Sequence, residues 1–240
     1  MSSIRLICFI WIFSALVANG GETAAKKDFI PTAFYTQKTL EGFTVLVSPE
    51  VLEHADVSSE ALALLETKLA EIRKLIPEEK LKPLMSIKFW VEWEADKRGA
   101  AVSHHSVEWL KSNGYNPEKV SCVEISNVKH FIAWTREAQP MMILHEVSHI
   151  FHHRVLGADN RDIKEAYDHA VKSGIYDKVD YYNGTKQRAY ALNNASEYFA
   201  EISEAYFGKN DFFPFTREDL KTFDPIGFAL MEKVWSAEKK

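Results

Sequence analysis

The sequence is poor in cysteine, in long apolar runs and in surplus positive charge. Only two cysteines occur in 240 residues, and the first, Cys8, lies in an N-terminal segment that we expect to be removed. Cys122 would then stand alone, so an intrachain disulfide is excluded and stability has to come from the core or from a bound metal. The formal net charge of −5 offers no basic surface, so we expect no nucleic-acid partner.

The longest apolar run lies at the N-terminus and is too short to cross a bilayer. It spans twelve residues, LICFIWIFSALV, from Leu6 to Val17, whereas a transmembrane helix needs about 20. Arg5 precedes the run and small residues follow it up to Gly20, which is the pattern of a secretory signal peptide. We therefore expect residues 1–20 to be a signal peptide, the protein to be secreted or extracytoplasmic, and no stable membrane insertion. Two glycosylation sequons would matter if the source is eukaryotic: they begin at Asn183 and Asn194.

The rest of the chain has no internal repeat and no low-complexity segment, and its hydrophobic pattern changes type along the way. Residues 21–39 read as an extended or loose lead-in. Alternating or short apolar runs then predict strands at 43–48, 85–93 and 119–126. The 3-4 spacing of apolar residues predicts a helix at 58–76, and SVEWLKSNG suggests a short helix at 106–114 that Gly114 closes. The patterns after residue 140 are helical: they predict helices at 140–157, 161–173 and 194–207, and two short ones after Pro214 and Pro225.

This order of elements predicts an α+β fold. We expect one domain over residues 21–240, in which a sheet-containing lobe at about 40–139 is followed by a helical part at about 140–240.

A histidine-rich stretch, MMILHEVSHIFHHRVLG, has four histidines within nine residues. His145, Glu146 and His149 fit the pattern H-E-x-x-H, and residues i and i+4 of a helix project from one face. Two imidazoles so placed can reach one zinc ion at about 2.1 Å. The apolar neighbours predict a mostly buried helix, in which unpaired His and Glu would be costly. We therefore predict one Zn²⁺ ion per chain, bound by His145 and His149, with Glu146 placed to touch a water on the metal.

The other two histidines of the stretch, His152 and His153, are weaker candidates. His153 lies eight residues beyond His145, which is roughly 12 Å along a helix axis and too far to share an ion. Either could bind a metal with His149 alone, but Glu146 would then be on the wrong side. We expect both to face solvent or to pack outside the site. The metzincin pattern fails, because it requires glycine and histidine where the chain has His152 and Val155.

The third ligand must then be a carboxylate from a later segment, and Glu165 and Glu197 are the candidates. Glu197 begins a stripe with Glu201 and Glu204, at i, i+4 and i+7 of a largely apolar helix. Buried carboxylates need cationic partners, which a zinc ion with two imidazoles provides. Glu165 has only His169 at i+4. We predict Glu197 as the metal ligand and Glu201 as the acceptor of the N–H group of a ligand histidine; a solvated acidic stripe is the alternative.

The pattern of H-E-x-x-H followed by a glutamate on a later helix resembles that of the gluzincin zinc peptidases. The block YALNNASEYFAE resembles in particular the catalytic domain of anthrax lethal factor, which has E-F-F-A-E and a tyrosine seven residues before its glutamate ligand. The likeness covers about 140–207, close to a third of the chain. It implies a zincin-like metallopeptidase fold with a small mixed sheet and an active-site helix, and it implies that Tyr190 assists the transition state.

Three protein ligands leave one zinc position open, which is typical of a catalytic site. We expect hydrolysis of a peptide or protein substrate, with Glu146 as the general base and Tyr190 stabilising the oxyanion. By analogy with zinc peptidases, the resemblance implies that the strand at 119–126 is the sheet edge to which an extended substrate adds as a further strand. Two alternatives stay open: a secreted zinc-binding protein without hydrolytic activity, and an amidase acting on cell-wall peptides.

Overall fold

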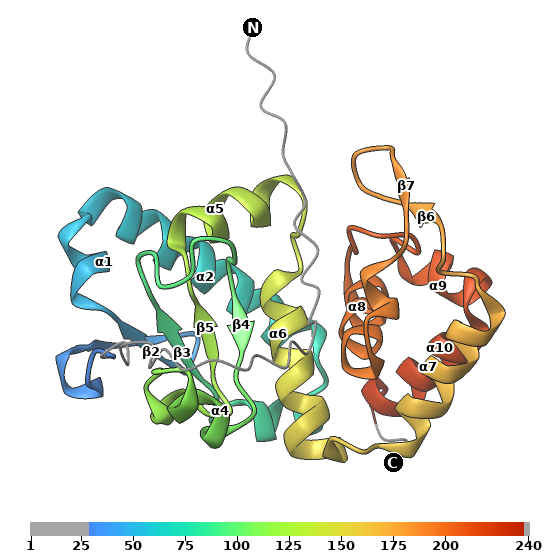
Figure 1. The fold of residues 1–240 in the computed structure, drawn as a ribbon, viewed down its shortest axis with the longest axis horizontal. Coiled ribbons are helices and arrows are strands. Elements are labelled where there is room, and N and C mark those ends of the chain that lie inside the picture. Colours follow the sequence, from blue (N-terminus) through green and yellow to red (C-terminus); the bar gives the residue numbers. More distant parts are fainter. Residues whose placement is uncertain (1–28, 238–240) are drawn as a thin grey trace, which may run out of the picture.

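A five-stranded mixed sheet and ten α-helices dominate the part of the chain that the structure describes, residues 29–237 (Figure 1). The structure is a computed structural model. Its mixed helix and sheet content confirms the α+β class. The predicted signal peptide at 1–20 and Cys8 lie outside the described residues. Among the residues described, no helix combines the length and the apolar character that crossing a membrane requires.

The sheet has the strand order β1-β2-β3-β5-β4. Strands β2, β3 and β5 are parallel to one another, and the outer strands β1 and β4 pair antiparallel with their neighbours. The strands are β1 (Thr36–Leu40), β2 (Phe43–Val47), β3 (Lys88–Val91), β4 (Val102–Ser103) and β5 (Val123–Ile125). The three central strands lie within the three segments that the sequence predicts as strands.

Strand β1 was not assigned from the sequence, and one prediction about the sheet is wrong. The lead-in at 21–39 contains most of β1, whose residues are mainly exposed and therefore show no apolar pattern. It turns into β2 through Glu41 and Gly42, which have positive φ angles of 50° and 85°, as the two central residues of a tight hairpin turn require. The wrong prediction concerns the strand at 119–126. It is not at the edge of the sheet, because β5 pairs with β3 on one side and β4 on the other.

Helices cover the sheet and form the second half of the chain (Figure 1). They are α1 (Pro49–Glu53), α2 (Ala55–Leu75), α3 (Glu78–Leu81), α4 (Val107–Ser112), α5 (Val128–Glu137), α6 (Met142–Phe151), α7 (Arg161–Ser173), α8 (Ala195–Phe207), α9 (Arg217–Phe223) and α10 (Pro225–Trp235). A small hairpin of β6 (Val179–Asp180) and β7 (Lys186–Gln187) lies between α7 and α8. Every helix predicted from the sequence is present, whereas α1, α3 and α5 were not foreseen.

Helix α6 lies between the sheet and the C-terminal helices (Figure 1). It contacts α2 and β4 on one side and α8 on the other, and one cluster of buried apolar side chains extends through both parts. The helix predicted at 140–157 changes type near its end, because residues His152–Gly157 form a π-helix. Gly157 closes it at a φ of 88°, a conformation that favours glycine. Wide turns of this kind are frequent at functional sites.

The sheet face that points away from α2 carries buried charges. Nζ of Lys119 donates to Oε1 of Glu92 at 2.6 Å and to Oε1 of Glu124 at 2.8 Å. Oε2 of Glu124 lies 2.5 Å from Nε2 of His104, and the hydroxyl of Tyr35 donates to Glu92 at 2.6 Å. Burial alone would raise the pKa of Glu124, but the hydrogen bond to His104 and the charge of Lys119 hold that pKa below its usual value. Lys119 is therefore the cation on which two buried carboxylates depend.

We expect Lys119→Met to lower the free energy of unfolding by about 3–5 kcal/mol, because it leaves buried carboxylates without their cation. Urea unfolding at neutral pH measures the change. The matched control is Lys164→Met, since Lys164 pairs with Asp168 at the surface and its side chain is 68% exposed; this variant should change stability by less than about 0.5 kcal/mol. Equal effects of the two substitutions would contradict the assignment.

Candidate metal centre

Two polar stripes face each other across the contact between α6 and α8. On the first helix the stripe is His145, His149 and His152, at i, i+4 and i+7, and His152 is the first residue of the π-helix. On the second it is Glu197, Glu201 and Glu204, with the same spacing. Apolar residues occupy most other positions of both helices. The two helices therefore bury imidazoles directly against carboxylates.

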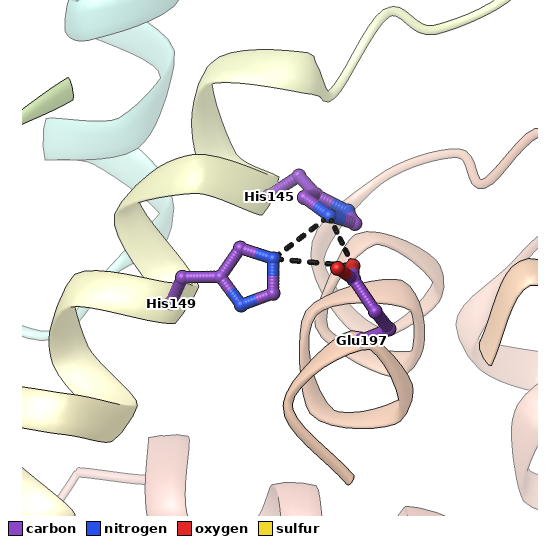
Figure 2. A group of neighbouring side chains, drawn as sticks. All are labelled: His145, His149 and Glu197. Carbon is purple, nitrogen blue, oxygen red and sulfur yellow. Dashed lines mark hydrogen bonds and ion pairs between the residues drawn. The ribbon is translucent and has the colours of Figure 1, made fainter. Parts of the chain in front are cut away.

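Three atoms of these stripes converge on one point (Figure 2). Nε2 of His145 lies 3.1 Å from Nε2 of His149 and 3.1 Å from Oε2 of Glu197. Nε2 of His149 lies 3.2 Å from the same carboxylate oxygen. Asn194 fixes Glu197 locally, because its side-chain oxygen accepts hydrogen bonds from the backbone N–H groups of Ser196 and Glu197 and so caps α8. The structure thus brings together the three residues predicted as metal ligands.

The three atoms fit a tetrahedral zinc site by distance and by chemistry. Ligand atoms about 2.1 Å from one tetrahedral ion lie about 3.4 Å from one another, close to the separations of 3.1 to 3.2 Å in the structure. Two imidazole nitrogens and one carboxylate oxygen are a common donor set of catalytic zinc. Within the described part of the chain, no fourth His, Cys, Asp or Glu joins this group, so one coordination position would be open.

Each imidazole also has a partner at its other nitrogen, which is the arrangement expected of metal-binding histidines. Nδ1 of His145 lies 2.7 Å from Oε1 of Glu204, and Nδ1 of His149 lies 2.8 Å from the hydroxyl oxygen of Ser196. Both Nε2 atoms are thereby left to face the shared point.

The predicted role of Glu201 is corrected by these contacts. Its nearest carboxylate oxygen lies 3.8 Å from Nδ1 of His145, beyond hydrogen-bond distance, and its other oxygen accepts from Nδ2 of Asn210 at 3.3 Å. Glu204, three residues further along α8, is the partner instead. The spacing along α8 placed both glutamates on the correct stripe, but the height at which His145 meets that stripe depends on how the two helices pack.

The field at this point favours a positive charge. Burial alone would lower the pKa of His145, yet its hydrogen bonds to Glu197 and Glu204 raise that pKa well above its usual value. Burial alone would likewise raise the pKa of Glu197, whereas the two imidazoles lower it. Without a metal, His145 would hold a proton between two carboxylates; a divalent cation would satisfy the same field with more charge.

Behind the ligands lies a group of buried carboxyl groups. Glu201 and Glu204 are each 3% exposed, and burial raises the pKa of both. Burial and the charge of Glu204 raise the pKa of Asp211 to about 7; Oδ2 of Asp211 accepts a hydrogen bond from Gln139. Neutral acids are favoured in such surroundings unless a cation is close by.

The two predicted catalytic residues adjoin the ligands, and the charge of Glu146 acts on both Tyr190 and Glu204. Glu146 follows the first ligand on α6 and is half-buried, and no hydrogen bond of its carboxylate is recorded among the described residues. The ring centroid of Tyr190 lies 6.4 Å from that of His145. Burial and the charge of Glu197 raise the pKa of Tyr190, so its hydroxyl stays a proton donor at neutral pH. Tyr190 begins a short 3₁₀ helix, Tyr190–Leu192.

This 3₁₀ helix is anchored at its C-terminal end. Arg188 donates hydrogen bonds to the carbonyl oxygen of Leu192 at 2.7 Å and to the side-chain oxygen of Asn193 at 2.8 Å. The hydroxyl of Tyr167, on α7, donates to the same carbonyl at 2.9 Å. The position of Tyr190 beside His145 is therefore fixed by Arg188 and by helix α7.

The remaining candidates lie outside the group. Glu165 is on α7, where its exposed side chain pairs with Arg161, so it is not near the two ligand histidines. His153 is half-buried, and its ring stacks on that of His105 at 3.8 Å. His152, expected outside the site, is instead buried in the stripe, with Nδ1 3.3 Å from the hydroxyl oxygen of Ser196.

Sequence reasoning missed two contacts of the site, those of Glu204 and Ser196. Glu204 was visible as a member of the acidic stripe, at two turns from Glu197. Ser196 directly precedes Glu197, but nothing in the sequence distinguishes a serine that contacts a ligand from one that merely begins a helix.

Comparisons with known proteins leave the site to be judged on its own geometry. Protein-family models, curated protein sequences and solved structures were all compared with the chain, and none matches it. The resemblance to gluzincin peptidases therefore rests on the motif residues described above, and the function rests on what these residues can do together.

Proposed function

We propose that this protein is a secreted zinc-dependent metallopeptidase with a zincin-like fold, in which His145, His149 and Glu197 bind the ion. One observation carries the proposal: three zinc-type ligand atoms converge, and the carboxylate of Glu146, next to the first ligand in the chain, acts through its charge on Tyr190 and Glu204 around them. The side chains of His145 and Glu197 remain 13% and 19% exposed, so the site reaches solvent. A purely structural zinc would be enclosed by four protein ligands.

The chemistry follows from the residues around the ion. A zinc ion held by His145, His149 and Glu197 would supply a Lewis acid that polarises a carbonyl and lowers the pKa of water to near 7. Glu146 takes a proton from the attacking water and later gives it to the leaving amine. Tyr190 donates its hydroxyl hydrogen bond to the oxygen of the tetrahedral intermediate. Glu204 and Ser196 hold the two imidazoles in place through their Nδ1 atoms.

The edge strand β4 supports a peptide as substrate. It contacts α6, and Val102 on it is 38% exposed. An extended peptide can add to a free sheet edge through main-chain hydrogen bonds, and β4 rather than β5 is the strand with such an edge on this side of the sheet. Metal analysis of the purified protein, followed by digestion of a peptide library with and without a chelator, tests the proposal. Absence of zinc, or cleavage that the chelator does not stop, would overturn it.

Glu146→Gln should retain zinc and lose hydrolysis by a factor on the order of 10²–10⁴, because the side chain keeps its shape but loses its basicity. Zinc content and initial rates on a cleaved library peptide measure the two effects. Glu165→Gln is the control on a neighbouring helix and should leave both unchanged. Near-normal turnover in Glu146→Gln would exclude Glu146 as the base.

Tyr190→Phe should lower kcat by about 10²–10³, the usual cost of removing one hydrogen-bond donor to an oxyanion. KM should change little, since the bond forms mainly in the transition state. Tyr115→Phe, which alters a half-buried tyrosine away from α6 and α8, serves as the control. A variant with unchanged kcat would show that Tyr190 is only a packing residue.

Zinc titration of four alanine variants tests the ligand and its orienting partner. Glu197→Ala should abolish stoichiometric binding, because two histidines and water make a weak site, and Glu165→Ala should leave affinity unchanged. Glu204→Ala should weaken zinc about 10–100-fold, the usual cost of losing a partner of a ligand histidine. Glu201→Ala is its matched control, equally buried on the same stripe, and should stay within about threefold. The reverse ranking of the last two would restore the role predicted for Glu201.

A further inference from the structure

Ser196 contacts two histidines of α6 and its π-helical extension at once. Its hydroxyl oxygen lies 2.8 Å from Nδ1 of His149 and 3.3 Å from Nδ1 of His152. His152 is 2% exposed, and its ring packs beside that of Phe199, with the centroids 5.5 Å apart. The other ring nitrogen of His152, Nε2, is buried and has no hydrogen-bond partner among the described residues.

The unpartnered nitrogen is what makes His152 unusual. A buried polar atom without a hydrogen bond is costly, and an aromatic or aliphatic side chain at this position would pack against Phe199 without that cost. Among side chains of the described residues, Ser196 is the hydrogen-bond partner of this ring; the backbone of Ala158 is its other polar neighbour. The value of His152 should therefore lie in what its Nδ1 does for Ser196.

The protons on these groups can be assigned in order from the metal outward. An imidazole that binds an ion through Nε2 carries its proton on Nδ1, so His149 donates and Ser196 accepts. The hydroxyl proton of Ser196 is then available for a second bond, and Nδ1 of His152 accepts it if the proton of His152 is on Nε2. Two hydrogen bonds thus run in one direction, from His149 through Ser196 to His152, and fix the rotation of the serine hydroxyl.

The second ligand histidine is held differently. Nδ1 of His145 faces a carboxylate, Glu204, whose charge fixes the tautomer directly. A serine hydroxyl can either donate or accept and rotates freely, so it fixes a tautomer only when its own proton is engaged elsewhere. His152 provides that engagement.

We infer that Ser196 and His152 are positioning residues that hold His149 in the tautomer and orientation needed to bind zinc through Nε2. This inference rests on the zinc-binding part of the proposed function and is independent of whether the protein cleaves peptides.

We call the two hydrogen bonds from His149 through Ser196 to His152 the relay. Zinc affinities of a small set of variants, measured by competition with a chromophoric chelator, test it. Ser196→Ala should weaken zinc about 10–100-fold. His152→Phe keeps the ring shape and removes the acceptor, so zinc should bind about three- to tenfold more weakly, one hydrogen bond further from the metal. His152→Asn places an amide oxygen where Nδ1 was and should bind within about twofold of wild type.

The matched control is Ser148→Ala. Ser148 is fully buried on α6 beside His149, but its hydroxyl donates to the backbone oxygen of Leu144 at 2.8 Å and touches no ligand. Its removal should leave zinc affinity within about twofold of wild type.

A spectroscopic readout separates positioning from a general structural role. In long-range ¹H–¹⁵N spectra of the zinc-bound protein, Nδ1 of His149 should carry a proton protected from solvent exchange. Ser196→Ala should lose that protection, whereas Ser148→Ala should keep it.

The outcomes are distinguishable. Wild type that binds no zinc would overturn the metal centre and the relay with it. If the wild type binds zinc tightly and Ser196→Ala binds it with unchanged affinity, the relay alone is overturned. Equal zinc affinities of His152→Phe and His152→Asn would overturn it as well. If Ser196→Ala does not fold, the two His152 variants decide the question by themselves.

Discussion

The contact between α6 and α8 holds the polar centre of the molecule together. Each helix is largely apolar, and each buries its few polar groups against those of the other: His145 lies between Glu197 and Glu204, and His149 lies between Glu197 and Ser196. Groups of this kind are tolerated in a core only when their partners are in place. The two helices consequently depend on each other's register, and the sheet and the C-terminal helices are positioned around that pair.

If the proposed metal binds, the same contact would link its binding to folding. Carboxyl groups of Glu201, Glu204 and Asp211 are buried close together, and burial raises their pKa values, so the metal-free centre favours protons on some of them. A cation bound to the folded state alone stabilises it, by about 2.7 kcal/mol when its free concentration is about 100 times the Kd. We expect that gain to arise chiefly where α6 meets α8, since that is where the charges are unbalanced.

The sequence predicts this centre well where a single helix decides the answer. The i, i+4 spacing of His145 and His149 and the acidic stripe of α8 both follow from helix geometry, and both are present. It fails where two helices decide together: Glu201 and Glu204 lie on the same stripe, and only the height at which His145 crosses α8 selects between them. The same limit applies to the sheet: a strand with its own apolar pattern is predictable, and a position set by pairing is not. The apolar strands β2, β3 and β5 are predictable, whereas β4 has only two residues and no pattern, and its place at the edge follows from a strand order that differs from the chain order.

The two proposed ligand histidines each need a partner at Nδ1 that fixes their tautomer, and the two partners are of different kinds. A carboxylate at Nδ1 fixes the tautomer by its charge, but that charge is then buried. Glu204 therefore needs a cation nearby to stay ionised. A hydroxyl adds no charge but must itself be oriented, which requires a third group. The centre uses the first solution at His145 and the second at His149. Since three carboxyl groups already lie behind His145, another carboxylate beside His149 would add repulsion in a poorly hydrated site, and a neutral serine with its own acceptor avoids that repulsion.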